Sequence, residues 1–152
     1  IFTEYGRMKP AKFRHEMARR AERTMHLTDW QKGELRKSLD ALCPSKAEVY
    51  FYFPPDNLAI IAHYRANDAQ GFAAFKQTVR DDVIQHNAAC SNKVHLFDFM
   101  IPSSITRDDA ATRGHESRYY LDPIHVRPPT GLLLLERMLL GHDTAIAKRM
   151  AG

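Results

Sequence analysis

The stretch Val49-Tyr50-Phe51-Tyr52-Phe53, stopped by Pro54-Pro55, decides the fold of this chain. It is rich in β-branched and aromatic residues, a composition typical of a β-strand. Its hydrophobicity is continuous rather than alternating, which predicts a strand covered on both faces, as in a parallel sheet. A second run of this kind, Val94-His95-Leu96-Phe97, ends at Asp98 and predicts another short strand.

The residues between these two strands have helical character. We expect helices over roughly 56–66 and 69–87, the second marked by apolar residues at helical spacing such as Phe72, Phe75, Val79 and Val83. Strand, helical crossover and strand make a βαβ unit, which favours a parallel sheet with helices on both faces.

Three further helices are expected outside this unit. Phe13, Met17, Ala21 and Met25 recur every fourth residue and predict a helix from about Pro10 to Met25. Thr28 and Gln31 form a capping-box pair that opens a helix reaching Cys43-Pro44. A last helix is expected over 128–140, with Leu132 to Leu135, Met138 and Leu139 forming a broad buried face.

Length and composition fit one folded domain over residues 1–152. With 44% hydrophobic residues the chain can bury a core, and its aromatic content argues against disorder. The apolar run around Leu132–Leu135 is too short to span a bilayer. Ile1-Phe2-Thr3-Glu4 lacks the features of a signal peptide. Because the chain does not begin with Met, we expect a processed product or a piece of a longer protein.

The formal net charge is +4, and much of the excess lies near the N-terminus. The basic residues of this cluster are Lys9, Lys12, Arg14, Arg19, Arg20 and Arg23. Such a cluster can meet phosphate or anionic lipid. The interpretation we favour is a solvated helix face, because Glu16 and Glu22 are interspersed and no nucleic-acid module accompanies it. We therefore expect no nucleic-acid partner.

Cys43 and Cys90 are the only cysteines, too few for a disulfide framework or an ordinary zinc site. Two unrelated buried thiols are the default interpretation. However, each cysteine ends a predicted helix just before a predicted strand. In a parallel sheet both would lie at the same end, so a disulfide is equally conceivable.

Asp122-Pro123-Ile124-His125 is the segment that carries chemistry. A histidine becomes a useful general base when a carboxylate fixes its tautomer and stabilises the imidazolium. Three-residue spacing in a turn before a helix can place both side chains at one rim of the sheet. The alternative is an Asp that caps the turn and a half-exposed His. The long polar segment 100–117 precedes this block, and loops of that length are usually functional or mobile.

The stretch Tyr119 to Pro128, followed by Gly131, resembles the last block of SGNH (GDSL-type) hydrolases, in particular bacterial envelope members. Tyr50–Pro54 is similar to the central strand of that family, Phe72–Val79 to the helix after it, and Phe97-Asp98-Phe99 to the following strand end. The resemblance implies a flavodoxin-like three-layer α/β sandwich with a mainly parallel sheet. It also implies that His125 is the general base and Asp122 its orienting partner.

The family's nucleophilic serine, in a Gly-Asp-Ser-like turn after the first strand, has no match here. Ser103 and Ser104 follow a strand in the wrong order, and Ser117 falls at the end of the polar segment. Asn67-Asp68 mimics an oxyanion-hole pair but lies between two helical segments. We expect the serine and first strand upstream of Ile1, so that this chain is the C-terminal part of a longer domain. A degenerate relative is the alternative.

The expected function is therefore hydrolysis or transfer of an acyl ester, on an acylated small molecule or glycan, in the bacterial periplasm or envelope. Arg127 and Asp98 are candidate substrate-binding residues. A salt bridge of Arg127 to Asp108-Asp109, and a turn or cap role for Asp98, are the alternatives. The histidines show no metal-ligand spacing, so we expect neither metal nor cofactor. A non-catalytic, glycan-binding envelope domain is the rival function, and membrane association would come through segments outside this sequence.

Overall fold

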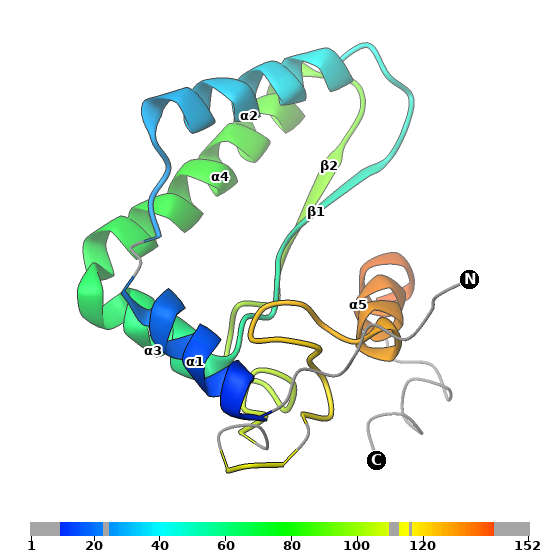
Figure 1. Ribbon diagram of the computed structural model, residues 1–152. Coiled ribbons are helices and arrows are strands. Elements are labelled where there is room, and N and C mark those ends of the chain that lie inside the picture. Colours follow the sequence, from blue (N-terminus) through cyan, green and yellow to red (C-terminus); the bar gives the residue numbers. More distant parts are fainter. Residues whose placement is uncertain (1–9, 23–24, 110–112, 116, 142–152) are drawn as a thin grey trace. The chain divides into compact units, whose positions relative to one another are not determined.

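The computed structural model describes residues 10–22, 25–109, 113–115 and 117–141 and shows a mixed α/β chain (Figure 1). Its elements in order are α1 (Pro10–Ala21), α2 (Asp29–Leu42), β1 (Val49–Phe53), α3 (Leu58–Asn67), α4 (Ala69–Ala89), β2 (Val94–Asp98) and α5 (Pro128–Leu140). Over these residues the two strands form one parallel sheet. The expected α/β class is thus confirmed, and so is the parallel βαβ unit.

The chain divides into two compact units, which we describe separately. The sheet unit comprises residues 22–53 and 62–98, with α2, α4, both strands and most of α3. The loop unit comprises residues 1–21, 54–61 and 99–152, with α1, the first turn of α3 and α5. The segments that directly follow β1 and β2 in sequence therefore belong to the loop unit.

The sheet unit is built on one apolar layer between helices and strands. The strands pair in register from Val49 opposite Val94 to Phe53 opposite Asp98. Leu39 of α2, Val83 of α4 and Val94 of β2 form its buried centre, and Leu35, Val49, Phe51 and Leu96 pack against it. In Figure 1, α2 and α4 lie along each other beside the strands.

The opposite face of the sheet has aromatic side chains. Side chains alternate along a strand, so Tyr50 and Tyr52 lie on the face away from α2 and α4. Tyr52 is 50% exposed. Within the sheet unit, the described helices α2 and α4 therefore pack against one face, and helical coverage of the other face stays a prediction. The continuous hydrophobicity of β1 arises because its second face is aromatic, with Tyr50 stacked on His95 at 4.9 Å.

Local sequence signals determine where the helices start. Thr28 caps α2 with both hydrogen bonds of a capping box, in which its hydroxyl accepts from Gln31 N–H and Gln31 Oε1 accepts from Thr28 N–H. Asp68 caps α4, because its Oδ1 accepts a 2.7 Å hydrogen bond from Gly71 N–H. Asp68 thus has a structural role, and α1 ends at Ala21 rather than near Met25.

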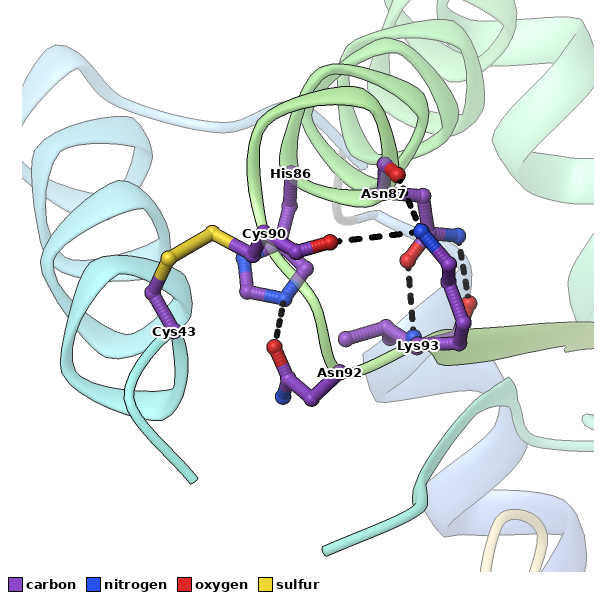
Figure 2. Close-up of a disulfide and its surroundings, with 7 residues drawn as sticks. Cys43, His86, Asn87, Cys90, Asn92 and Lys93 are labelled. Atoms are coloured by element: carbon purple, nitrogen blue, oxygen red, sulfur yellow. Dashed lines mark hydrogen bonds between the residues drawn. A yellow bond between two sulfur atoms is a disulfide. The ribbon is translucent and has the colours of Figure 1, made fainter. Parts of the chain in front are cut away.

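Cys43 and Cys90 form a disulfide, with Cα atoms 5.2 Å apart (Figure 2). Cys43 is the C-cap of α2 and Cys90 the C-cap of α4. The disulfide alternative is confirmed over two unrelated thiols, for the expected reason. Both helices end at the edge of the sheet where their following strands begin.

The loop unit has its own apolar core. Its buried apolar side chains are Phe13, Met17, Ile60, Ile61, Met100, Ile105, Tyr120, Leu133, Leu134 and Met138. Helix α5 has the expected bounds and ends at Gly141, whose φ of 71° is the left-handed conformation that glycine adopts readily. The prediction that α5 has a broad buried face was wrong, because Leu132, Leu135 and Leu139 are 47%, 49% and 59% exposed. These three lie on one stripe and Leu133, Leu134 and Met138 on another.

The basic cluster is a helix face where it is described. Lys9 and Arg23 lie outside the described residues. On α1, Lys12, Arg14 and Arg19 are exposed, and Glu16 accepts hydrogen bonds from both Arg19 and Arg20. In the part of the chain that the structure covers, no helix has both the length and the apolar character to cross a membrane.

Candidate functional site

The Asp122–His125 segment forms a closed loop in the loop unit. Tyr120 and Val126 pair as an antiparallel bridge. Leu121 N–H donates to His125 C=O at 2.8 Å, and Arg127 N–H donates to Tyr119 C=O at 2.8 Å. These backbone bonds bring the two ends of the loop together and leave Asp122 and His125 to project from it.

Asp122 is held in place by its own backbone surroundings. Its Oδ1 accepts hydrogen bonds from Ile124 N–H at 3.0 Å and His125 N–H at 2.9 Å. This is the Asx-turn geometry that aspartate favours in turns. Pro123 is buried and has a fixed φ. The carboxylate therefore has one oxygen committed to the turn and the other directed to the histidine ring.

That second oxygen, Oδ2, lies 2.6 Å from His125 Nδ1. Burial raises the pKa of Asp122, but the hydrogen bonds from His125 and from the Ile124 and His125 amides outweigh it, so the pKa lies below its ordinary value. An ionised carboxylate accepts the proton on Nδ1, which leaves Nε2 as the basic nitrogen. The His125 side chain is 67% exposed and that of Asp122 is 22% exposed. The basic nitrogen is thus on an accessible ring.

Tyr120 anchors this loop to the segment that follows β1. Its side chain is 2% exposed, and its hydroxyl donates a 2.6 Å hydrogen bond to Pro55 C=O. Burial raises the pKa of Tyr120, and the nearby carboxylates of Asp56 and Asp108 raise it further, so the hydroxyl remains a donor. The base of the loop is therefore fixed by a buried hydrogen bond between residues 65 apart in sequence.

Asp56 is a site residue that the sequence analysis missed. It is 4% exposed, and burial raises its pKa to about 6, while Arg20 and His125 oppose the rise. His125 is thus close enough for its charge to act on this second carboxylate, in addition to Asp122. The available signal was a carboxylate three residues beyond the end of a strand, which the sequence analysis interpreted only as the start of a helix.

The polar segment before the loop is organised by Asp108. Its Oδ2 accepts hydrogen bonds from the Ser117 hydroxyl at 2.6 Å and from the Arg118 and Tyr119 amides. Its backbone C=O accepts from the Asn57 side chain at 2.7 Å. Residues 110–112 and 116 lie outside the described chain. Where it is described, the segment is tied to the loop and to the residues after β1.

The serines of this region make hydrogen bonds of a structural kind. The Ser117 side chain is buried and also accepts from Tyr120 N–H at 2.9 Å. The Ser103 hydroxyl lies 3.2 Å from the Thr106 hydroxyl and accepts from Thr106 N–H. These contacts close turns. They do not form the strained strand-to-helix turn of an activated nucleophile.

The two candidate substrate-binding residues lie in different surroundings. Arg127 Nε donates to Tyr120 C=O at 3.3 Å, and Arg127 lines a hollow of about 220 Å³ with Arg118, Tyr119, Thr130 and Leu133 in the loop unit. Asp98 is the last residue of β2, in the sheet unit, and both its oxygens accept from Lys76, at 2.7 and 2.9 Å. The sequence did not indicate that ion pair.

Within the described residues, no three histidine, cysteine, aspartate or glutamate side chains are arranged to hold a metal ion. Comparisons of the chain with models of known protein families, with curated proteins and with solved structures gave no match. The chemical interpretation of the Asp122–His125 loop therefore depends on its own geometry.

Proposed function

We propose that this chain supplies the Asp-His part of a Ser-His-Asp triad in an acyl-ester hydrolase or acyltransferase. The observation that carries the proposal is the 2.6 Å contact of Asp122 Oδ2 with Nδ1 of an imidazole that is 67% exposed. In the same proposal the fold is a three-layer, SGNH-like sandwich, completed by strands from a longer protein. The nucleophilic serine comes from that longer protein too.

In this mechanism His125 Nε2 removes the proton from the serine hydroxyl as the serine attacks the ester carbonyl. Asp122 keeps Nδ1 protonated and stabilises the imidazolium that forms. His125 then gives the proton to the leaving alcohol oxygen. A second cycle with water, or with an acceptor hydroxyl, releases the acyl group. Donors outside this chain hold the oxyanion.

Arg127 is the candidate substrate-binding residue beside the Asp122–His125 pair. It follows His125 by two residues, and the hollow that it lines combines guanidinium groups with the apolar side chains of Pro129 and Leu133. Such a lining suits a substrate that has an anionic or strongly polar group next to an apolar one. Arg127→Ala should therefore raise KM more than it lowers kcat.

The decisive experiment measures ester turnover by the full-length natural protein and its variants. His125→Ala should lower kcat by about four to six orders of magnitude, since it removes the general base. Asp122→Asn should cost up to about 10⁴-fold, because it disturbs the tautomer and leaves the imidazole in place. His115→Ala is the matched control, because His115 is an exposed histidine of the same unit.

Two results would remove the proposal. One is the absence of ester or acyl-transfer activity in the full-length protein, and the other is turnover that survives His125→Ala undiminished. Either result would support the non-catalytic envelope domain instead. The 152-residue chain alone should show no burst with an activated ester and no labelling by a serine-reactive phosphonate. Stoichiometric labelling of Ser103 or Ser104 would move the nucleophile into this chain.

A further inference from the structure

The hollow beside the Asp122–His125 loop contains a second arginine in addition to Arg127. It has a volume of about 220 Å³. Its lining residues are Arg118, Tyr119, Arg127, Pro129, Thr130 and Leu133. Arg118 and Arg127 come from the two ends of the loop, which the hydrogen bond from Arg127 N–H to Tyr119 C=O holds together. Two guanidinium groups therefore line one hollow of the loop unit.

Both guanidinium groups are held beside the hollow by contacts within the protein. Arg127 Nε donates to Tyr120 C=O at 3.3 Å, and the Arg118 guanidinium lies over the Tyr119 ring, 5.4 Å from its centroid. A guanidinium has five N–H donors in a fixed fork, so the Arg127 group can hold this carbonyl and an anion at the same time. These contacts restrict both side chains before a ligand binds, which lowers the entropy that binding costs.

The charge of the lining is positive. Among the six described residues that line the hollow, none is an aspartate or a glutamate. Asp108 lies nearby, since its Oδ2 accepts from the Arg118 and Tyr119 amides, but it does not line the hollow. Two positive charges in the lining favour an anion, and the guanidinium fork matches the paired oxygens of a carboxylate or a phosphate.

The rest of the lining is largely apolar. Leu133 is 6% exposed, and Pro129 has no polar side-chain atom. The Thr130 hydroxyl donates to Tyr119 C=O at 3.1 Å, so towards a ligand it can only accept. The volume is below the roughly 300–1,000 Å³ of pockets that enclose a whole small ligand. The hollow therefore fits one end of a ligand, with an anionic group next to apolar carbon.

We propose that Arg118 and Arg127 bind the carboxylate or phosphate of a small anionic ligand whose apolar part lies against Pro129 and Leu133. Arg127 follows His125 by two residues, which places their Cα atoms at most about 7 Å apart. A ligand held in the hollow can therefore present a bond a few atoms from its anionic group to the imidazole. The identification of this ligand as the substrate rests on the proposed function, and it names the substrate class as acyl esters that bear an anionic group.

The test measures the binding of small probes to the 152-residue chain, so it does not depend on ester turnover. In NMR spectra, phenylacetate should shift the side-chain N–H resonances of Arg118 and Arg127 until the site is saturated. Phenylacetamide has nearly the same shape without the charge, and it should bind roughly tenfold more weakly. Inorganic phosphate should compete with phenylacetate but bind more weakly, because it has no apolar part to lie against Leu133.

Variants separate this site from general attraction to a basic chain. Arg118→Ala and Arg127→Ala should each weaken phenylacetate binding about three- to tenfold. Arg127→Lys should restore only part of the loss, since lysine keeps the charge without the fork. Arg107→Ala is the matched control and should leave the affinity unchanged, because Arg107 is an exposed arginine of the same unit that does not line the hollow.

The backbone amide spectrum shows whether each variant stays folded. Arg127 also holds Tyr120 C=O, so if its variants unfold, Arg118→Ala decides, since it leaves that hydrogen bond in place. The proposal is overturned if phenylacetate does not bind, if phenylacetamide binds as tightly, or if folded Arg118→Ala keeps the wild-type affinity. Phosphate that binds more tightly than phenylacetate would identify the anionic group of the ligand as a phosphate.

Failure of this site and failure of the proposed function give different results. Binding of phenylacetate by the chain, without ester turnover in the full-length protein, would keep the anion site and remove the proposed function. Ester turnover that requires His125, without binding of any probe, would keep the proposed function and remove the anion site.

Discussion

Two histidines of the chain, His125 and His86, contrast in their exposure and in their hydrogen-bond partners. The His125 side chain is 67% exposed, and its Nδ1 contacts a carboxylate that keeps it protonated. His86 is 5% exposed, and its Nε2 contacts a neutral amide. The ring of His125 is therefore accessible from solution, whereas the ring of His86 is enclosed by the protein.

The rings of His125 and His86 are also held in position in different ways. His125 is held by residues three or fewer positions away, within a loop closed by backbone hydrogen bonds. His86 is held by the end of a long helix, the turn after it and a disulfide across 47 residues. A change near His125 should thus alter chemistry with little cost in stability. A change near His86 should alter the stability of a whole unit.

The largest expected effect on stability comes from removing the disulfide. Replacing both cysteines (Cys43→Ala with Cys90→Ala) should lower the free energy of unfolding by about 4 kcal/mol, the loop-closure value for a separation of 47 residues. His125→Ala is the comparison variant and should change the free energy of unfolding by less than about 0.5 kcal/mol, because the side chain is exposed. Urea unfolding under oxidising conditions measures both. Equal losses of unfolding free energy in the two variants would contradict the difference expected between the two regions.

A smaller effect is expected from Asp56, the buried carboxylate near His125. Its pKa is raised from 3.8 to about 6 in the folded chain. The folded state therefore holds this proton more tightly than the unfolded state, so stability falls as pH rises from about 4 to about 6. One pKa unit corresponds to about 1.4 kcal/mol, so Asp56→Asn should raise the free energy of unfolding at pH 7 by up to about 3 kcal/mol.

The same comparison at pH 4 is the internal control for Asp56→Asn. At pH 4 Asp56 is protonated in the folded state and close to half protonated in the unfolded state, so the gain should fall to about 0.5 kcal/mol. Asp109→Asn is the matched control, because the Asp109 side chain is 56% exposed. A gain for Asp56→Asn that is the same at pH 4 and pH 7 would contradict the assigned ionisation.

The smallest effect concerns the anchor of the Asp122–His125 loop. Tyr120→Phe removes the hydroxyl that donates to Pro55 C=O and should cost about 1 to 2 kcal/mol of unfolding free energy, because a buried carbonyl loses its donor. Tyr50→Phe should cost less than about 0.5 kcal/mol, since its hydroxyl bonds the exposed Glu48 two residues away. Thermal unfolding of the two variants measures both costs. An equal cost in both would mean that the loop does not depend on this anchor.

Much of the secondary structure could be predicted because its signals are local. The bounds of β1 and α5, the capping box at Thr28 and the end of β2 at Asp98 follow from propensity, capping and proline chemistry within a few residues. The spacing of Asp122 and His125 also acts locally, and the structure shows both expected roles of Asp122, the turn cap through Oδ1 and the contact with His125 through Oδ2. A turn of three residues brings the two side chains together wherever the loop lies.

The features that escaped prediction depend on residues far apart in sequence. The ion pair of Asp98 with Lys76 forms only when α4 lies against the end of β2. Asp56 and Asp82 look like ordinary surface carboxylates in sequence, yet they are 4% and 5% exposed. The exposed stripe of α5 looked buried because leucines occur on both stripes of that helix. Hydrophobicity indicates which residues can be buried, but it does not indicate which of two apolar faces of a helix packs against another segment.

By itself, then, the sequence indicated most of the helix and strand positions, the parallel orientation of the two strands and the turn that brings Asp122 close to His125. The tertiary structure decided that Cys43 and Cys90 join, that Asp56 lies buried within reach of the charge on His125, and that His86 keeps one nitrogen buried beside the disulfide. The physical reason is the distance along the chain over which each kind of interaction acts. Hydrogen bonds and backbone preferences act within a few residues of the chain. Burial and its effect on a charge, by contrast, depend on every segment that packs around a group.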